Sequence, residues 1–531
     1  MKSILKYSFI GLLALAFSAC TSDFEKINTN PYEATDDMLE ADNLTVGSFF
    51  SQMIVRMIPF VAGGAQDDSY GSTGSYQHFQ GLCSDWYSGY VAPTGTWKGG
   101  NHNAVYSFEG NWGNSMYQQN YTQIMPTWRT ICINAAKKDS PQEAALATIV
   151  KVLAMHRVTD QFGPIPYVNY TTETISNQFD SQEAVYKKFF EELDESIEVL
   201  APYAAAGATI LGSFDKIYQG NVDKWVRLAN TLRLRLALRI VYVNPSLAKS
   251  EGEKALSSSV GFLSDASDRA TISGIGILNP LWEQAYSWNE ERMNASMDAY
   301  LNGYDDPRRA AWFTTCADGK YHGVRLGVVT NTNTDYIGDN ISNFNLTSSS
   351  TLVYFSAAES YFLRAEAALR GWNAGGTAKD FYEQGIRVSF AEQGVNGGVD
   401  AYIASTNEPA AFVDNTGKGG DAAKPSSITV AYDESASFEQ NLERIITQKW
   451  IANFLISPEG WAEYRRTGYP KLFPTTRNLS GNIDINKQIR RMPYPQDLYD
   501  NNRAGVQQAI GLLGGADNGA TKLWWDKNPN H

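Results

Sequence analysis

The sequence of 531 residues is poor in the side chains that bind metals or form disulfides, with 4 cysteines and 5 histidines. The cysteines form no C-x-x-C pair, and the histidines form no H-E-x-x-H or His-x-His motif. We therefore expect neither a zinc site nor another metal centre, and no cofactor. Outside the N-terminal region the cysteines are Cys83, Cys132 and Cys316, an odd and scattered set. One disulfide among them is left open, but buried free thiols are the interpretation that we favour.

The sequence also lacks an excess of basic residues, because 44 Lys and Arg stand against 57 Asp and Glu, for a net charge of −13. This balance argues against a nucleic-acid partner, which would require a basic face. There is no G-x-S-x-G motif, no phosphate-binding G-x-x-x-x-G-K motif and no segment that resembles a catalytic-carboxylate motif, so catalysis is not expected. Beyond the N-terminus no apolar run reaches 18 residues. With 43% hydrophobic residues, the chain can nevertheless bury a large core.

The N-terminus carries the features of a secretory signal peptide. Two lysines precede an apolar run at residues 9–17, which is too short to cross a membrane as a helix. Residues 17–20 (FSAC) resemble a lipobox. This resemblance implies that residues 1–19 are a signal peptide and that Cys20 is acylated and anchors the chain to a membrane. The acidic residues after Cys20 resemble an export signal, so we expect a lipid-anchored protein of the outer membrane that faces the cell exterior.

The rest of the chain is dominated by helical periodicity. Apolar residues recur at spacings of three and four, and Ser, Asn or Thr stands where several of the runs begin. The predicted helices are residues 141–160, 181–200, 221–240, 352–372, 377–391 and 437–455. Alanines at close-contact positions and short loops suggest tetratricopeptide-like helix pairs, although no 34-residue period runs cleanly. Because no Pro/Ser-rich linker interrupts the chain, we expect residues 20–531 to form a single domain.

Five segments, in this order, resemble the SusD/RagB-like nutrient-binding outer-membrane lipoproteins. They are residues 28–31 (NTNP), 154–167 (AMHRVTDQFGPIPY), 356–370 (SAAESYFLRAEAALR), 446–466 (ITQKWIANFLISPEGWAEYRR) and 491–495 (RMPYP) followed by Asn501 and Asn502. The resemblance implies a mainly α fold, in which tetratricopeptide-like helix pairs support a large loop-rich ligand-binding face. It also implies a lid over a SusC-like TonB-dependent outer-membrane barrel. Such a protein captures an oligosaccharide or oligopeptide and delivers it to the barrel without catalysis.

The matched motifs are interpreted as scaffold rather than as ligand contacts. A buried, charge-assisted network around an indole is expected from Trp461, Glu463, Arg465 and Arg466. His156 shares one helical face with apolar residues and is expected in the core with its polar atoms satisfied. Four arginines on the helix at 221–240 predict a solvated or salt-bridged face; they are Arg227, Arg233, Arg235 and Arg239.

The best candidate for a binding site is the segment 76–128, which holds 12 aromatic residues among 53, with asparagines and glycines between them. Ring faces cover the C–H surface of sugars and amides bond their hydroxyls, but the same loop also suits an extended peptide. We expect Trp86, Trp97 and Trp112 to be exposed, because polar residues and glycine flank them. The alternative is that many of these rings only pack the loop onto the helices. The candidate ligand-binding residues are Asp67, Asp68, Tyr70, Tyr76, His78, Trp86, Tyr87, Tyr90, Trp97, Asn101 and Trp112.

A second aromatic segment, residues 284–292 with Trp282, Tyr286 and Trp288, could add a wall to the pocket or contact the barrel. The pair Asp67 and Asp68 is also consistent with a solvated turn, and a calcium site is a third alternative. Two other functions are kept as alternatives to the nutrient-binding lipoprotein. They are a surface glycan-degrading enzyme and a helical-repeat adaptor that binds proteins alone.

Overall fold

The computed structural model describes residues 43–62, 71–108, 112–171, 176–272, 275–329, 335–418 and 420–531. The predicted signal peptide and lipidated Cys20 lie outside these residues. So do the candidate site residues Asp67, Asp68 and Tyr70.

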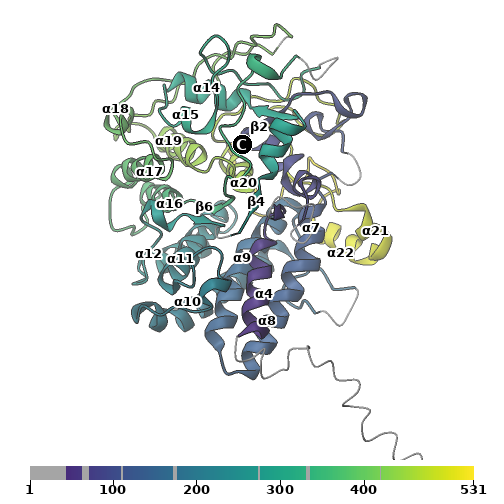
Figure 1. Ribbon diagram of the computed structural model, residues 1–531, viewed down its shortest axis with the longest axis vertical. Helices are drawn as coiled ribbons and strands as arrows, with labels where there is room; N and C mark the ends of the chain where they lie inside the picture. Colours follow the sequence, from purple (N-terminus) through teal and green to yellow (C-terminus); the bar gives the residue numbers. More distant parts are fainter. Residues whose placement is uncertain are drawn as a thin grey trace, which may run out of the picture.

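Helices make up most of the described chain (Figure 1). The longer ones are α4 (Leu44–Val55), α8 (Met125–Lys137), α9 (Pro141–Phe162), α10 (Gln182–Ala205), α11 (Val222–Arg239), α12 (Pro245–Leu256), α16 (Ala357–Leu369), α17 (Ala378–Glu392), α19 (Phe438–Ala452), α20 (Ser457–Thr467) and α22 (Arg503–Leu513). The shorter α-helices are α5 (Thr73–Tyr76), α6 (Ser84–Tyr87), α7 (Ser115–Gln119), α13 (Pro280–Trp282), α14 (Ala295–Gly303), α15 (Arg309–Trp312), α18 (Val399–Ile403) and α21 (Gln496–Asn501). The 3₁₀ and π turns are η1 (Gln77–Gly81), η2 (Trp97–Gly100), η3 (Asn103–Val105), η4 (Asn120–Ile124), η5 (Gly212–Phe214), η6 (Ala266–Asp268), η7 (Glu283–Ser287) and η8 (Gly338–Asn340).

All six predicted helices are present, and four of them begin where a side chain caps the first turn. The side chains of Ser181, Asn221, Thr377 and Ser437 each accept a hydrogen bond from the backbone N–H three residues later. The prediction for 352–372 was wrong in its first turn, because Val353–Phe355 forms strand β6 and helix α16 starts only at Ala357.

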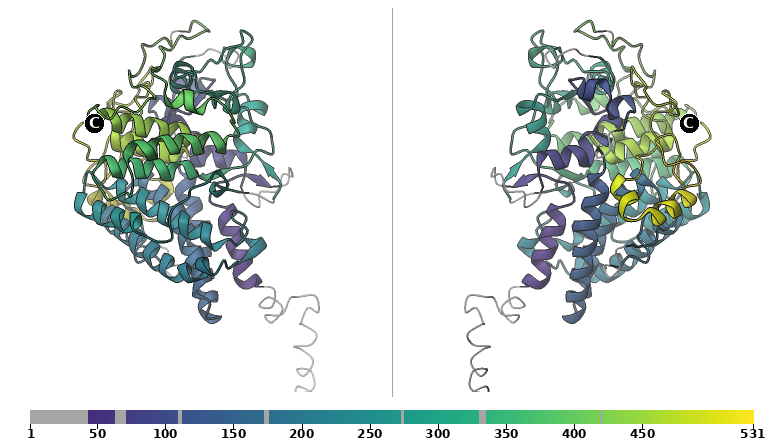
Figure 2. Two further views of the ribbon diagram at one scale, coloured as in Figure 1. Left: turned by 90° about the vertical axis from the view of Figure 1, so that its left-hand side faces the viewer. Right: turned by 90° about the vertical axis from the view of Figure 1, so that its right-hand side faces the viewer.

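Successive helices pack against each other in chain order. Helix α8 packs on α9, α9 on α10, α10 on α11 and α11 on α12, and α16 then packs on both α17 and α19. These pairs confirm the predicted tetratricopeptide-like architecture. Figures 1 and 2 show α4, α8, α9 and α10 in the lower part of the molecule, and α14, α15, α18 and strand β2 among the loops of the upper part.

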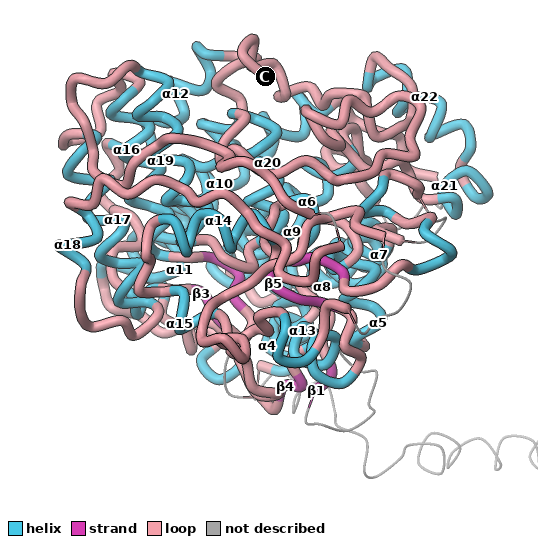
Figure 3. The backbone as a smooth tube through the Cα atoms, turned by 90° about the horizontal axis from the view of Figure 1, so that it is seen from above, coloured by secondary structure: helices cyan, strands magenta, loops and turns pink. Residues whose placement is uncertain are grey.

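In the described part of the chain, three small antiparallel sheets connect loops that are distant in sequence (Figure 3). Strand β1 (Val61–Ala62) pairs with β4 (Ile277–Leu278), β2 (Val91–Pro93) with β5 (Glu291–Met293), and β3 (Ala270–Thr271) with β6 (Val353–Phe355). Each sheet joins segments that are more than 80 residues apart. The strand pairing therefore fixes the positions of the long irregular stretches relative to one another.

A network of buried ion pairs joins helices α11, α16, α19 and α20. Arg235 makes two hydrogen bonds to Glu359, at 2.8 and 2.6 Å, and the Lys449 ammonium lies 2.9 Å from Glu459. These four side chains are buried, and so is Arg239, which pairs with Glu459 and Glu463. The salt-bridged alternative for the α11 arginines is therefore confirmed, and three of them, Arg233, Arg235 and Arg239, are buried.

The predicted network around Trp461 is confirmed. The Arg465 guanidinium lies 3.7 Å from the centre of the Trp461 ring, and Arg466 donates to Glu463 at 2.6 Å. His156 is buried and its Nδ1 lies 3.0 Å from the Val152 carbonyl oxygen, as expected for a core histidine.

The three cysteines outside the N-terminal region are unpaired, with Cys83 and Cys316 buried and Cys132 half-buried. Among the described helices, none is long and apolar enough to cross a membrane.

Candidate ligand-binding site

The sheet formed by β2 and β5 brings the two aromatic segments of the sequence together. Pro93 is opposite Glu291, so the chain that leaves β2 and the chain that enters β5 meet at the same end of the sheet. The Thr94 N–H donates to the Glu290 carbonyl at 2.9 Å, and its hydroxyl donates to the Asn289 carbonyl at 2.6 Å. The loop that carries Trp97 therefore lies beside the turn that carries Trp288.

The second aromatic segment presents the more exposed rings. Tyr286 and Trp288 are each 38% exposed, and the Trp282 ring stacks on Tyr286 with centroids 5.8 Å apart. Asn279 caps this segment by accepting from the Trp282 N–H, and the π turn η7 then carries the chain to Trp288. The Tyr286 hydroxyl donates to the Phe344 carbonyl at 2.6 Å, which fixes the position of the ring.

The first aromatic segment contributes half-buried rings to the same end of the sheet. Trp97 packs against Trp86 with centroids 5.4 Å apart and against Trp112 at 5.9 Å. Below them, the Trp86 indole N–H donates to both carboxylate oxygens of Glu291 at 3.1 Å. Burial raises the pKa of Glu291 well above its ordinary value, although the hydrogen bond from Trp86 opposes this effect. We call the set Trp97, Trp112, Trp282, Tyr286 and Trp288 the aromatic surface.

The polar groups beside the aromatic surface include amides, a carboxyl group, an imidazole and the Lys98 ammonium, which lies 5.9 Å from the centre of the Trp112 ring. The Gln77 amide donates to Glu290 at 2.8 Å, and burial raises the pKa of that carboxyl group. His78 is half-buried, and burial lowers its pKa, so the imidazole is neutral at pH 7. Asn101 is exposed. Amide, carboxyl and imidazole groups next to flat rings can bond hydroxyls while the rings cover C–H faces.

Several predicted site residues are buried, and the expected exposure of Trp86 was wrong. Trp86 is inaccessible because Glu291 bonds its indole N–H and the Trp97 and His102 rings cover it. Tyr87 and Tyr90 are also buried, and their hydroxyls donate to the carbonyls of Asn103 and Trp450. These two rings pack the loop onto the helices, which was the alternative interpretation.

Tyr76 is buried as well, with its hydroxyl 2.9 Å from Asp85, and it lines a separate cavity. The candidates that the structure brings to the aromatic surface are Trp97 and Trp112, and His78 and Asn101 lie on neighbouring turns. Gln77, Thr94 and Glu290 lie within the two segments that the sequence indicated, but sequence reasoning did not single them out. Gln77 and Glu290 are 213 residues apart, and only the pairing of β2 with β5 could have indicated that they meet.

Comparison with known proteins places the chain in a family. The family model of SusD and RagB outer membrane lipoproteins, SusD-like, matches residues 26–526. No curated protein matches the chain.

Solved structures with the same fold include a chitin-binding SusD homologue from Flavobacterium johnsoniae, at 39% identity and a TM-score of 0.85, covering 92% of this chain and 100% of that one. A SusD homologue from Bacteroides uniformis ATCC 8492 is 39% identical with a TM-score of 0.84, covering 91% and 99%. One from Bacteroides vulgatus ATCC 8482 is 35% identical with a TM-score of 0.86, covering 93% and 100%. This chain belongs to the SusD-like family of outer membrane lipoproteins.

Proposed function

We propose that this protein is a cell-surface lipoprotein, anchored through Cys20, that binds an oligosaccharide on the aromatic surface. It then delivers the sugar, as a lid, to a SusC-like TonB-dependent barrel in the outer membrane. The observation that carries the proposal is the pair of accessible rings, Tyr286 and Trp288, at the end of the sheet where the Trp97 loop arrives.

The chemistry of the surface favours sugar over peptide as the ligand. Neutral sugars present C–H faces that stack on rings and hydroxyls that bond to amides and carboxyl groups. The rings of Tyr286 and Trp288 supply the first contact, and Gln77, Glu290 and Asn101 supply the second. The relative from Flavobacterium johnsoniae is described as chitin-binding, which makes β-linked N-acetylglucosamine oligomers the first ligands to test.

The binding test is isothermal titration of the mature chain with N-acetylglucosamine hexamer. We expect Trp288→Ala to weaken binding at least tenfold, which is about 1.4 kcal/mol, because aromatic anchors dominate such contacts. Tyr203→Ala is the matched control, since Tyr203 is 37% exposed on α10, and it should leave the affinity unchanged. A panel of neutral glycans and of tri- to hexapeptides completes the test. Binding of peptides but of no glycan would contradict the proposal.

The delivery role is tested on intact cells. A SusC-like partner should co-purify from gently solubilised outer membranes, because stable partners commonly bury more than about 2,000 Å². Cys20→Ala should release the protein from the membrane fraction. Recovery of the wild-type protein without any barrel would count against its role as a lid. Shortening of the bound oligosaccharide over hours would instead favour the alternative of a glycan-degrading enzyme.

A further inference from the structure

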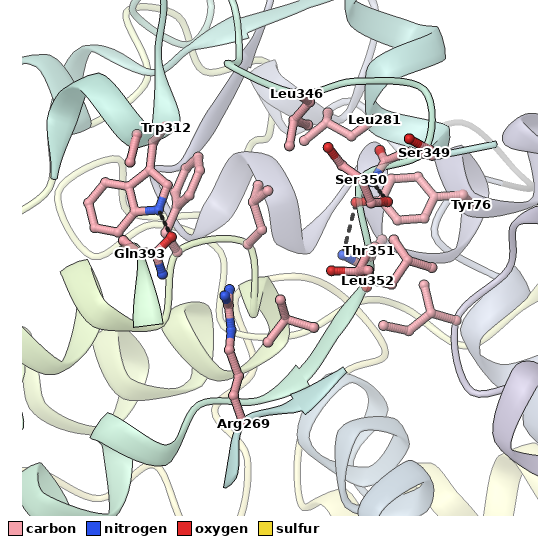
Figure 4. Close-up of a pocket in the computed structure, with 17 residues that line it drawn as sticks. Tyr76, Arg269, Leu281, Trp312, Leu346, Ser349, Ser350, Thr351, Leu352 and Gln393 are labelled. Atoms are coloured by element: carbon pink, nitrogen blue, oxygen red, sulfur yellow. Dashed lines mark hydrogen bonds between the residues drawn. The ribbon is translucent and has the colours of Figure 1, made fainter. Parts of the chain in front are cut away.

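Beside the aromatic surface, the described chain contains a cavity of about 380 Å³ with an unusual charge distribution (Figure 4). Tyr76 and Gln80 of α5 and η1, Asn279 and Leu281 at α13, and Trp312 of α15 line it, together with residues 349–353. Among the described residues that line it, Arg269 is the one with a charged side chain, and none is a carboxylate.

Arg269 is a cation with few partners. It stands between η6 and strand β3, and Figure 4 shows its guanidinium rising into the cavity. Within the described chain it makes one hydrogen bond, from Nη1 to the Glu392 backbone carbonyl at 3.3 Å, and its buried Nε has no hydrogen-bond partner. Burial lowers the pKa of Arg269, although the nearby Glu392 opposes this effect.

The Glu392 carboxylate attracts Arg269 but is engaged elsewhere. Its oxygens accept from the Ser356 hydroxyl at 2.8 Å and from the Ala357 N–H at 2.6 Å, at the start of α16. The carboxylate therefore caps a helix instead of forming the paired hydrogen bonds that a guanidinium can make. A partly desolvated cation without such a pair is costly, and an anion that entered the cavity would remove part of that cost.

The remaining lining groups suit the rest of a small polar ligand. The Trp312 indole N–H donates to the Gln393 Oε1 at 2.9 Å, which orients the amide at the wall of the cavity. Asn279 donates to the Ser350 carbonyl at 3.0 Å and holds the 349–353 loop, whose hydroxyls line the same space. The side-chain amide oxygen of Gln80, Oε1, is buried and has no hydrogen-bond partner among the described residues.

We propose that the Arg269 cavity is a second binding site, which takes the carboxylate of a captured ligand through the Arg269 guanidinium. The carboxylate belongs to an acidic sugar, such as a uronic acid, or to the C-terminus of a peptide. This inference extends the proposed function by naming a chemical group of the ligand. It rests on the proposed function only in treating that ligand as a nutrient that the protein captures.

The test compares matched ligands that differ in the carboxylate. D-glucuronate and D-glucose form one pair, and alanylalanine and its C-terminal amide form the other, each titrated by ligand-observed NMR at constant ionic strength. We expect glucuronate to bind at least tenfold more tightly than glucose, because hydrogen bonds to charged groups are the stronger ones. Arg269→Gln should abolish that preference, and Arg269→Lys should restore part of it.

Two further variants keep the test informative if Arg269→Gln folds poorly. Thr351 is an exposed residue of the lining, so Thr351→Glu places a competing carboxylate at the cavity and should also abolish the preference. Arg364→Gln is the matched control, because Arg364 is a half-buried arginine on α16 that packs on Tyr361 and does not line the cavity. It should leave the preference intact.

The outcomes separate this site from the aromatic surface. The carboxylate site would be overturned if glucuronate bound no better than glucose and alanylalanine no better than its amide. It would also be overturned if the preference for the carboxylate ligand survived in Arg269→Gln. Preference for alanylalanine over its amide, without preference for glucuronate, would support the site and count against a glycan as its ligand. Loss of hexamer binding in Trp288→Ala bears on the aromatic surface alone.

Discussion

Replacing Glu366 by glutamine should destabilise the protein by about 3 kcal/mol at neutral pH. Glu366 of α16 accepts two hydrogen bonds from Arg466 of α20, at 2.7 and 2.6 Å, and both residues are fully buried. Breaking a buried ion pair by removing one partner costs about 3–5 kcal/mol, because the other charge is left unpaired. Arg466 keeps a bond to Glu463, so the lower end of that range applies.

The lowered pKa of Glu366 leads to a stability contribution of the same order. Burial alone would raise the pKa of Glu366, but Arg466 and Arg370 outweigh it and lower the pKa from 4.5 to about 2. A carboxylate with a depressed pKa stabilises the fold above its unfolded pKa, and the contribution is lost as the pH falls through about 2. At 1.36 kcal/mol per unit, this also amounts to about 3 kcal/mol.

Urea denaturation at pH 7 measures the free energy of unfolding of the wild type and Glu366→Gln. Glu183→Gln is the matched control, because Glu183 pairs with Lys187 at 2.7 Å on the surface, and it should change stability by less than about 0.5 kcal/mol. The double variant Glu366→Met, Arg466→Met should cost less than the sum of the single changes. A loss below about 1 kcal/mol for Glu366→Gln, unchanged between pH 7 and pH 3, would refute the reasoning.

Three other predictions concern single buried positions. Burial raises the pKa of Asp85 to about 6, so the contribution of Asp85 to wild-type stability should fall as the pH rises from 4 to 7. Over that range Asp85→Asn should gain up to about 3 kcal/mol relative to the wild type in urea denaturation. Gly385→Ala should cost about 1–3 kcal/mol, because its Cβ would lie 2.8–3.0 Å from three atoms of the buried Phe362 ring. At exposed Gly511, where no atom of the described residues lies within 4 Å of an added Cβ, the same change should be neutral or stabilising in a thermal melt. The Cys83 thiol, whose pKa burial raises to about 12, should not react with Ellman's reagent at pH 8 until urea unfolds the chain.

The helices could be predicted because their signals are local. A capping side chain and its N–H partner are three residues apart, as at Ser181 and Ser437, and the apolar stripe repeats within one turn. The start of α16 could not be found in this way. Val353–Phe355 is a strand only because Ala270–Thr271, more than 80 residues earlier, pairs with it.

Exposure of the aromatic rings was harder to predict, because it depends on partners that are distant in sequence. Trp86 has polar neighbours in the sequence, yet Glu291, 205 residues away, supplies the buried acceptor that holds its indole inside. Trp288 also has polar neighbours, and it stays accessible. Flanking residues therefore report the polarity of a segment and not the direction in which its rings point.

The Arg269 cavity could not be predicted from the sequence either. Its lining is drawn from separate segments, and a lone arginine among serines and amides forms no motif in any of them. Yet η1 serves both candidate sites, since Gln77 bonds Glu290 beside the aromatic surface while Gln80 lines the cavity. A ligand held at both sites would contact the two ends of one π turn. The residues that decide ligand chemistry are therefore set by how η1 meets β5 and α13, and this packing is not encoded in any short stretch of the sequence.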